Sequence, residues 1–164
     1  MNPCPCGQFG HGECRCSPLQ IQRYLNRISG PLLDRIDMHV EMGAVSYENI
    51  SQKAGEEYSA DVRARVNAAR ERQEKRFAGD GIHCNAQLDS RLSKRYCEPD
   101  ALGEEILKRA FEGMRLSARA YSRILKVART IADLAASERI GANHIAEAVQ
   151  YRSLDRKYWG GDDQ

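Results

Sequence analysis

The sequence predicts a mainly α-helical fold in which an irregular cysteine-rich loop and one strand precede a helical bundle. Over residues 82–150, apolar residues recur at three- and four-residue spacing, which is the pattern of helices with one buried face. Aromatic residues are only 7% of the 164 residues, and alanine and arginine are abundant, which favours helices over a β-sandwich. Hydrophobic residues reach 41%, which is enough to form a packed core.

Composition also excludes several classes of protein. No apolar run approaches the roughly 18 residues of a transmembrane helix, and the N-terminus lacks the basic flank and apolar run of a secretory signal. The six cysteines therefore suggest a reducing compartment, so we expect a cytoplasmic protein without a membrane partner. The net charge of +2 implies no partner by itself. Because the phosphate-binding pattern G-x-x-x-x-G-K-S/T is absent, the chain is not expected to hydrolyse a nucleotide alone.

The first 45 residues combine a loop, a short helix and a strand. Residues 1–18 are rich in Cys, Gly and Pro, which predicts an irregular loop. A short helix follows, and Ser29-Gly30-Pro31 marks a turn or a helix start. In residues 36–42 apolar and polar side chains alternate, which predicts a half-buried strand.

The remaining residues are predicted to be helical, up to a disordered tail at 160–164. Residues 46–77 form a highly charged predicted helix, with Ser46 or Ser59 as its N-cap and the glycine-containing turn 78–81 as its end. Further helices are expected at 87–96, from 98–100 to 112 with Pro99 in the first turn, at 117–137 and after the candidate N-cap Asn143.

Four cysteines are arranged as two C-x-C pairs, Cys4 with Cys6 and Cys14 with Cys16. Four thiolates can surround Zn²⁺ tetrahedrally, and two pairs on facing arms of a loop are a usual way to supply them. Glycines between the pairs permit the tight turns that this arrangement needs. Zinc is therefore a candidate cofactor at this loop, and the alternative is a set of free thiols or disulfides.

The stretch Leu-Leu-Asp-Arg-Ile-Asp ending at Asp37 places a fixed cation, Arg35, beside the predicted strand. Phosphoryl transfer uses such a cation, supplied by a neighbouring subunit, to stabilise charge on the γ-phosphate. The residues alone leave a second interpretation open, in which Arg35 pairs with Asp34 or Asp37 on a solvated surface.

Three separated motifs resemble, in the same order, the C-terminal part of magnesium-chelatase-like AAA+ ATPases. They are Met-Asn-Pro-Cys-Pro-Cys-Gly at the N-terminus, YLNRISGPLLDRID from Tyr24 to Asp37, and LSARAYSRILKVARTIADL from Leu116 to Leu134. The resemblance extends from Asn2 to Arg152. The paired C-x-C set is similar to that of the ComM-like branch, whereas magnesium chelatase subunits proper generally lack it.

This resemblance implies roles for individual residues. Asn2 matches the sensor-1 polar residue, which positions the water that attacks the γ-phosphate. Arg35 matches the arginine finger that reaches a neighbour's nucleotide. Arg119 matches the sensor-2 arginine at the start of a lid helix, and Arg123, one turn further on, is the second candidate for that role. The resemblance thus implies ATP and Mg²⁺ as cofactors of the full-length protein.

A domain organisation is implied as well. Residues 1–45 correspond to the C-terminal remnant of the AAA+ core, with the zinc loop and the arginine finger, and residues 46–159 correspond to the helical lid. The Walker A and Walker B segments would lie upstream, so the chain is expected to be a piece of a longer protein. The full-length protein is expected to form a homo-oligomeric ring, a hexamer, with ATP between the upstream core and a neighbouring subunit.

A basic segment suggests DNA as a further partner of the ring. Between Asp61 and Tyr96, nine basic and five acidic residues differ by +4. A basic face can contact phosphates by releasing counterions, and the candidate residues are Arg63, Arg70, Lys75 and Arg76. An ordinary solvated helix with Glu–Arg pairs is the alternative. In ComM-like proteins the ring is associated with DNA branch migration during natural transformation.

Three functions therefore stay open. The first is the lid and sensor part of a ring ATPase that acts on DNA. The second is a chelatase-type motor that drives magnesium insertion into a tetrapyrrole, and this function requires a porphyrin-binding partner. The third is a zinc-stabilised helical interaction module without a connection to ATP.

Overall fold

The structure is a computed structural model, and it describes residues 3–9, 13–42, 47 and 57–152. The helices within these ranges are α1 (Pro18–Leu25), α2 (Gly30–Leu33), α4 (Ser59–Arg76), α5 (Ser90–Tyr96), α6 (Ala101–Gly113), α7 (Ala118–Leu134), α8 (Ala142–Gln150) and the short 3₁₀ helix η1 (Asn85–Gln87). The predicted mainly α-helical fold with an N-terminal cysteine-rich loop is confirmed.

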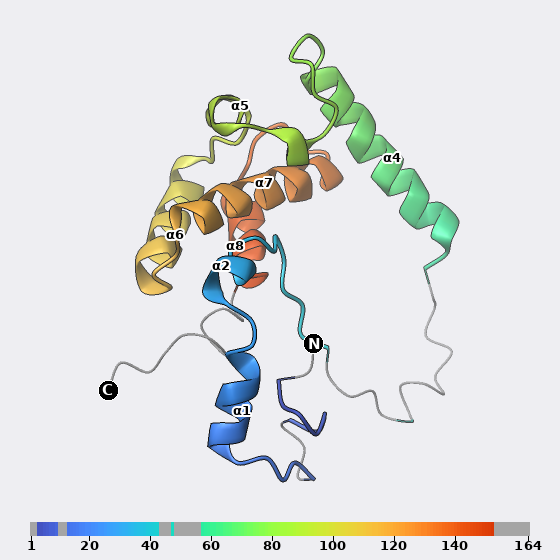
Figure 1. Cartoon of the computed structure of the whole chain (residues 1–164). Helices are drawn as coiled ribbons and strands as arrows, with labels where there is room; N and C mark the ends of the chain where they lie inside the picture. Colours follow the sequence, from blue (N-terminus) through green and yellow to red (C-terminus); the bar gives the residue numbers. More distant parts are fainter. Residues whose placement is uncertain (1–2, 10–12, 43–46, 48–56, 153–164) are drawn as a thin grey trace.

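Helix α7 is the centre of the bundle. It packs against α4, α5, η1 and α8, and α6 packs against α8, as the arrangement in Figure 1 shows. Its buried face repeats at helical spacing and consists of Ala120, Ile124, Leu125, Ala128 and Ala132. Because the alanines at its middle are small, neighbouring helices can approach closely, and larger side chains such as Phe77, Leu107 and Ile145 complete the core.

Side-chain caps set several helix starts, and several predicted boundaries were wrong. The helix predicted at 87–96 is the short η1 followed by α5, which begins at Ser90. Helix α6 begins at Ala101, so Pro99 precedes it and does not lie in its first turn. Ser117 and Asp100 accept a hydrogen bond from a backbone N–H in the first turn of α7 and α6, respectively. The N-cap of α8 is Gly141, not Asn143. Helix α7 ends at Leu134 rather than 137, because Ala136 adopts φ 56° and turns the chain away.

A buried polar cluster joins α4 to α7. Asp133 is 0% exposed, and its carboxylate accepts hydrogen bonds from Arg76 Nη1 at 2.9 Å, Asn85 Nδ2 at 2.8 Å and Arg129 Nε at 3.2 Å. Arg129 also donates to the backbone oxygen of Glu138 at 2.8 Å, which fixes the turn after α7. Burial lowers the pKa of Arg129, and the charge of Asp133 opposes that shift, so the cluster is a partnered buried ion pair.

The strand predicted for residues 36–42 does not form, and this prediction was wrong. The segment is irregular with a bend at Asp37, and its apolar side chains Ile36, Met38, Val40 and Met42 are all exposed. Its backbone touches the bundle through the His39 N–H, which donates to the Tyr151 oxygen at 2.8 Å. A strand needs a hydrogen-bonded neighbour, and the described part of the chain holds no other strand.

Some predictions concern residues outside the described ranges. They are the Ser46 cap, the first residues of the helix expected at 46–77, and the tail at 160–164. Within the described ranges that helix begins at Ser59 and its N-cap is Tyr58, so the prediction of Ser59 as the N-cap was wrong. None of the helices described is long and apolar enough to cross a membrane.

Candidate functional site

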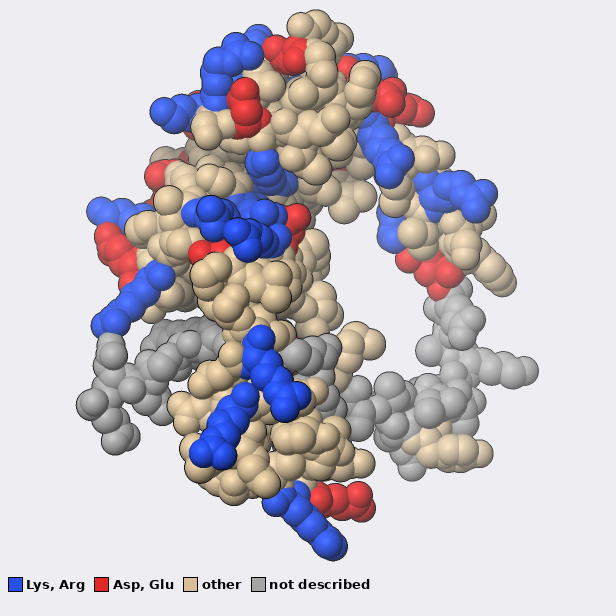
Figure 2. All heavy atoms as spheres, in the orientation of Figure 1, with Lys and Arg blue, Asp and Glu red and all other residues tan. Residues whose placement is uncertain are grey.

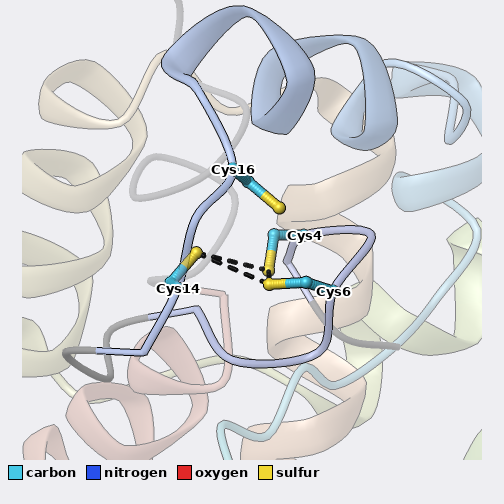
Figure 3. A group of neighbouring side chains, drawn as sticks. All are labelled: Cys4, Cys6, Cys14 and Cys16. Carbon is cyan, nitrogen blue, oxygen red and sulfur yellow. Dashed lines mark hydrogen bonds between the residues drawn. The ribbon is translucent and has the colours of Figure 1, made fainter.

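The four cysteines of the two C-x-C pairs lie together, with all four sulfur atoms within 4.8 Å of one another (Figure 3). The Sγ atom of Cys4 is 3.3 Å from that of Cys6 and 3.9 Å from that of Cys14, and Cys6 is 3.7 Å from Cys14. In a tetrahedral site with Zn–S bonds of about 2.3 Å the sulfurs are separated by about 3.8 Å. The donor set and its spacing therefore fit Zn²⁺, whereas a disulfide needs about 2.05 Å.

Local sequence explains how the loop brings the pairs together. Gly7, directly after Cys6, has φ 81°, and its N–H donates to the Cys4 oxygen at 3.3 Å, which closes a tight turn. Ser17, directly after Cys16, caps α1 reciprocally with Gln20, so the second pair leads into the start of that helix.

The thiols of the cluster differ in pKa, so they do not ionise equally readily. A backbone hydrogen bond from Gln8, with side-chain hydrogen bonds from Cys4 and Cys16, lowers the pKa of Cys6 to about 6. At Cys16 a backbone hydrogen bond from Cys6 favours the thiolate. The side-chain hydrogen bond with Cys6 and desolvation outweigh it, and they raise the pKa of Cys16 to about 11. A dication among the sulfurs would allow all four to be thiolates.

The segment that carries Arg35 begins with α2, where Pro31 occupies a first-turn position, and it turns at Asp34. The guanidinium of Arg152, after the end of α8, is bound to this turn. Its Nη1 atom donates to the backbone oxygens of Leu33 and Ile36, and its Nη2 atom lies 3.8 Å from Asp34 Oδ1. The Arg152 side chain is 1% exposed, so this contact is part of the interior.

Arg35 itself is exposed, and within the described residues its guanidinium has no hydrogen-bond or ion-pair partner. The structure contradicts the alternative in which Arg35 pairs with Asp34 or Asp37. Asp34 is bound to Arg152, and Asp37 is bound to Arg123. Both neighbouring carboxylates therefore form ion pairs with other arginines, and Arg35 stays available to a ligand outside the chain.

The two candidate sensor arginines lie on the first two turns of α7. Arg119 is exposed and, among the described residues, has no ion-pair partner, whereas Arg123 is bound to Asp37 and its side chain is 27% exposed. Arg119 is thus the more available of the two to a phosphate. Asn2, the candidate sensor-1 residue, lies outside the described residues.

The basic residues predicted to contact nucleic acid divide into two groups on α4. Arg63, Arg70 and Lys75 are exposed, and Figure 2 shows Lys and Arg atoms interspersed with Asp and Glu atoms along this helix. The fourth, Arg76, is bound to Asp133, and only 16% of its side chain is exposed, so its charge is used inside the bundle. A pocket on α5 is lined by Ser90, Arg91, Lys94 and Arg95, which adds cations suited to an anionic ligand.

Sequence reasoning missed two residues that organise the site, Asp133 and Arg152. For Asp133 a signal existed, because it lies four residues after Arg129 on the apolar face of a predicted helix, where an ion pair is buried. Arg152 gave no signal, because its partners are backbone oxygens of a segment far away in the sequence.

Comparison with known proteins covers both parts of the chain. Residues 56–152 match the family described as Magnesium chelatase, subunit ChlI C-terminal, and residues 1–50 match Magnesium chelatase, subunit ChlI. Among curated relatives, the uncharacterized protein YifB of Salmonella typhimurium is 43% identical over 157 residues. The competence protein ComM of Haemophilus influenzae is 44% identical over 158 residues. In each case 95% of this chain is covered, and the chain spans 30% of the relative's length.

Proposed function

Because the chain belongs to the magnesium chelatase ChlI family, in its ComM/YifB branch, we propose that it carries the arginine finger, the sensor 2 and the lid of a ring-forming ATPase. The full-length ring, a hexamer in this proposal, binds ATP and Mg²⁺ with an upstream core and acts in the cytoplasm. Arg35 reaches the γ-phosphate held by a neighbouring subunit, Arg119 senses the nucleotide, and Asn2 positions the attacking water.

The observation that supports this proposal most directly is the exposure of Arg35 and its lack of an ion-pair partner among the described residues. Its two neighbouring carboxylates are bound by other arginines, and its own guanidinium is exposed. An arginine finger must be free in its own subunit, because its partner is the charge that develops on another subunit's phosphate.

The test is Arg35→Ala in the full-length protein. We expect ATP turnover to fall on the order of 10³-fold or more under conditions in which the ring forms. Arg23→Ala, which removes another exposed arginine from the same part of the chain, is the matched control and should keep wild-type turnover. Wild-type turnover by Arg35→Ala in an assembled ring would rule out the finger assignment.

We propose DNA as the substrate on which the ring acts. The relative named competence protein ComM supports this proposal, as do the exposed cations Arg63, Arg70 and Lys75 on α4. A triple alanine variant at these positions should reduce the dependence of log K on log salt concentration by up to about 3, one unit for each lost phosphate contact.

The matched control for DNA binding removes three exposed cations elsewhere, at Lys108, Arg109 and Arg139. It changes the net charge equally and should leave the salt dependence close to that of the wild type. Equal salt dependence of the α4 variant and the wild type would exclude this helix as the DNA contact.

The family description favours a second candidate, a chelatase-type motor for magnesium insertion into a tetrapyrrole. The two candidates share the ATPase and differ in the partner. Stimulation of ATP turnover by DNA supports the first, and stimulation by a tetrapyrrole-binding partner protein supports the second.

For the cysteine cluster we propose a structural Zn²⁺ held by Cys4, Cys6, Cys14 and Cys16. Four thiolates complete a tetrahedral shell, so such an ion stabilises the loop and leaves no position for a substrate. The spacing of the sulfurs supports this assignment, since the sulfur–sulfur distances of 3.3, 3.7 and 3.9 Å lie on both sides of the tetrahedral value.

A further inference from the structure

The segment around Arg35 is bound to the lid at several points that follow one another along the chain. Arg152 binds the backbone oxygens of Leu33 and Ile36 and lies 3.8 Å from Asp34. Arg35 is therefore the residue in the middle of the turn that this one buried guanidinium holds. Both hydrogen bonds come from one nitrogen, Nη1, while Nη2 faces Asp34 at 3.8 Å, so the planar guanidinium touches the turn on both sides of Arg35.

Because the Arg152 guanidinium is buried, it needs hydrogen-bond acceptors from the protein. An almost fully buried guanidinium needs partners, because taking a charge out of water without them is costly. The Arg152 side chain is 1% exposed, whereas the side chain of its partner Asp34 is 30% exposed. The turn therefore lies on the outer side of the buried arginine. If the turn moved away from α8, the buried guanidinium would lose these two backbone acceptors.

Two further contacts continue the attachment beyond Arg35. Asp37 is ion-paired with Arg123, which lies on the same helix as Arg119. The His39 N–H donates to the oxygen of Tyr151, the neighbour of Arg152, at 2.8 Å. The residues from Leu33 to His39 are thus joined both to the helix that carries the candidate sensors and to the end of α8.

We propose that Arg152 is a positioning residue that fixes the arginine finger to the lid, so that the finger presented to one neighbour follows the lid of its own subunit. This inference rests on the proposed function, because it needs Arg35 to act on a nucleotide. Arg152 does not contact the nucleotide itself, and it affects ATP turnover through the position of Arg35. A shift of about 1 Å in a catalytic group is enough to lower a rate about 10²-fold.

A double-mutant cycle on ATP turnover of the full-length protein tests the proposal. Lysine at position 152 keeps the charge but replaces the planar guanidinium, whose Nη1 donates to both backbone oxygens while its Nη2 faces Asp34, with a single ammonium nitrogen. We expect Arg152→Lys to lower kcat by about 10²-fold, with a much smaller change in KM. In an Arg35→Ala background, the same substitution should change turnover by no more than about twofold, because the finger that it positions is already absent.

Arg129→Lys is the matched control, because Arg129 is also buried but is bound to Asp133 and the turn after α7. It should lower turnover by the same factor with and without Arg35. Equal losses for Arg152→Lys in both backgrounds would overturn the positioning role while leaving the finger assignment intact. Unchanged turnover in Arg35→Ala alone would instead overturn the proposed function.

If thermal melting shows that Arg152→Lys does not fold, Asp37→Asn takes its place in the cycle. Its side chain is 60% exposed, so the substitution removes the ion pair with Arg123 without opening the core. A loss of turnover that disappears in the Arg35→Ala background supports the attachment of the finger to the lid. Wild-type turnover, or an equal loss in both backgrounds, overturns it.

Discussion

Arg76, the last residue of α4, donates hydrogen bonds to both carboxylate oxygens of Asp133 on α7. The two side chains join the charged outer helix to the centre of the bundle, and Asn85 and Arg129 bind the same carboxylate. This relationship explains how a helix with few apolar residues on its surface is held in place.

Replacing Asp133 with alanine is therefore expected to be severely destabilising. The substitution leaves Arg129 and Arg76 without their shared acceptor, and breaking a buried pair in this way costs about 3–5 kcal/mol. Urea unfolding of the chain measures the loss of free energy of unfolding. Asp61→Ala, at an exposed position of α4, should cost about 0.5 kcal/mol or less. Similar losses in the two variants would contradict the role of the cluster.

Reduced protein is expected to bind one equivalent of Zn²⁺ with release of protons. The pKa of Cys6 is about 6, so this thiol is already ionised at pH 7, whereas the pKa values of Cys14 and Cys16 are raised. Binding at pH 7 should therefore release protons from Cys14 and Cys16, at least two in total, and affinity should fall as pH falls. Calorimetry in two buffers of different ionisation enthalpy counts these protons.

Cys4→Ser and Cys84→Ser are the matched pair for this prediction. Cys4 contributes to the cluster, whereas Cys84 lies beside Gln87 at the start of η1. Cys84→Ser should keep the full equivalent of zinc, measured by atomic emission. Less than about half an equivalent in the wild type would contradict the metal site.

Ala136→Gly is expected to stabilise the chain. Ala136 has φ 56°, and its N–H and that of Ser137 donate to the oxygens of Asp133 and Ala132, as in a Schellman motif that favours glycine. Relief of this conformation should add about 1 kcal/mol to the free energy of unfolding and raise Tm. Ala135→Gly, one residue earlier at φ −78°, should lower Tm instead. A lower Tm for both variants would show that the left-handed turn is not populated.

Periodicity predicted the bundle well because α7 buries a continuous face, from Ala120 to Ala132, and a buried face leaves a local pattern. Alternation at residues 36–42 predicted a strand wrongly, because a local alternation of apolar and polar residues does not show whether a neighbouring strand exists to pair with the segment. The pattern of the N-terminal loop correctly indicated that four cysteines could meet.

Single residues of the candidate site were harder to predict than helices. Arg76 and Arg70 look alike in the sequence, yet one is bound to Asp133 and the other is exposed. The difference depends on how α4 packs on α7, and the spacing of residues within α4 gives no information about that packing. Arg152 could not be predicted either, because its contacts also depend on tertiary packing and its partners are backbone oxygens, which every residue has.

The central claim, that Arg35 serves a nucleotide held by a neighbouring subunit, is tested most directly by mixing two inactive full-length variants. One is Arg35→Ala, and the other has its upstream phosphate-binding loop disabled. If the finger acts across a head-to-tail interface, random mixed rings at equal ratio should recover about a quarter of wild-type ATP turnover, from sites that pair an intact loop with a neighbour's intact Arg35. Mixed rings that form and show no recovery would contradict the claim.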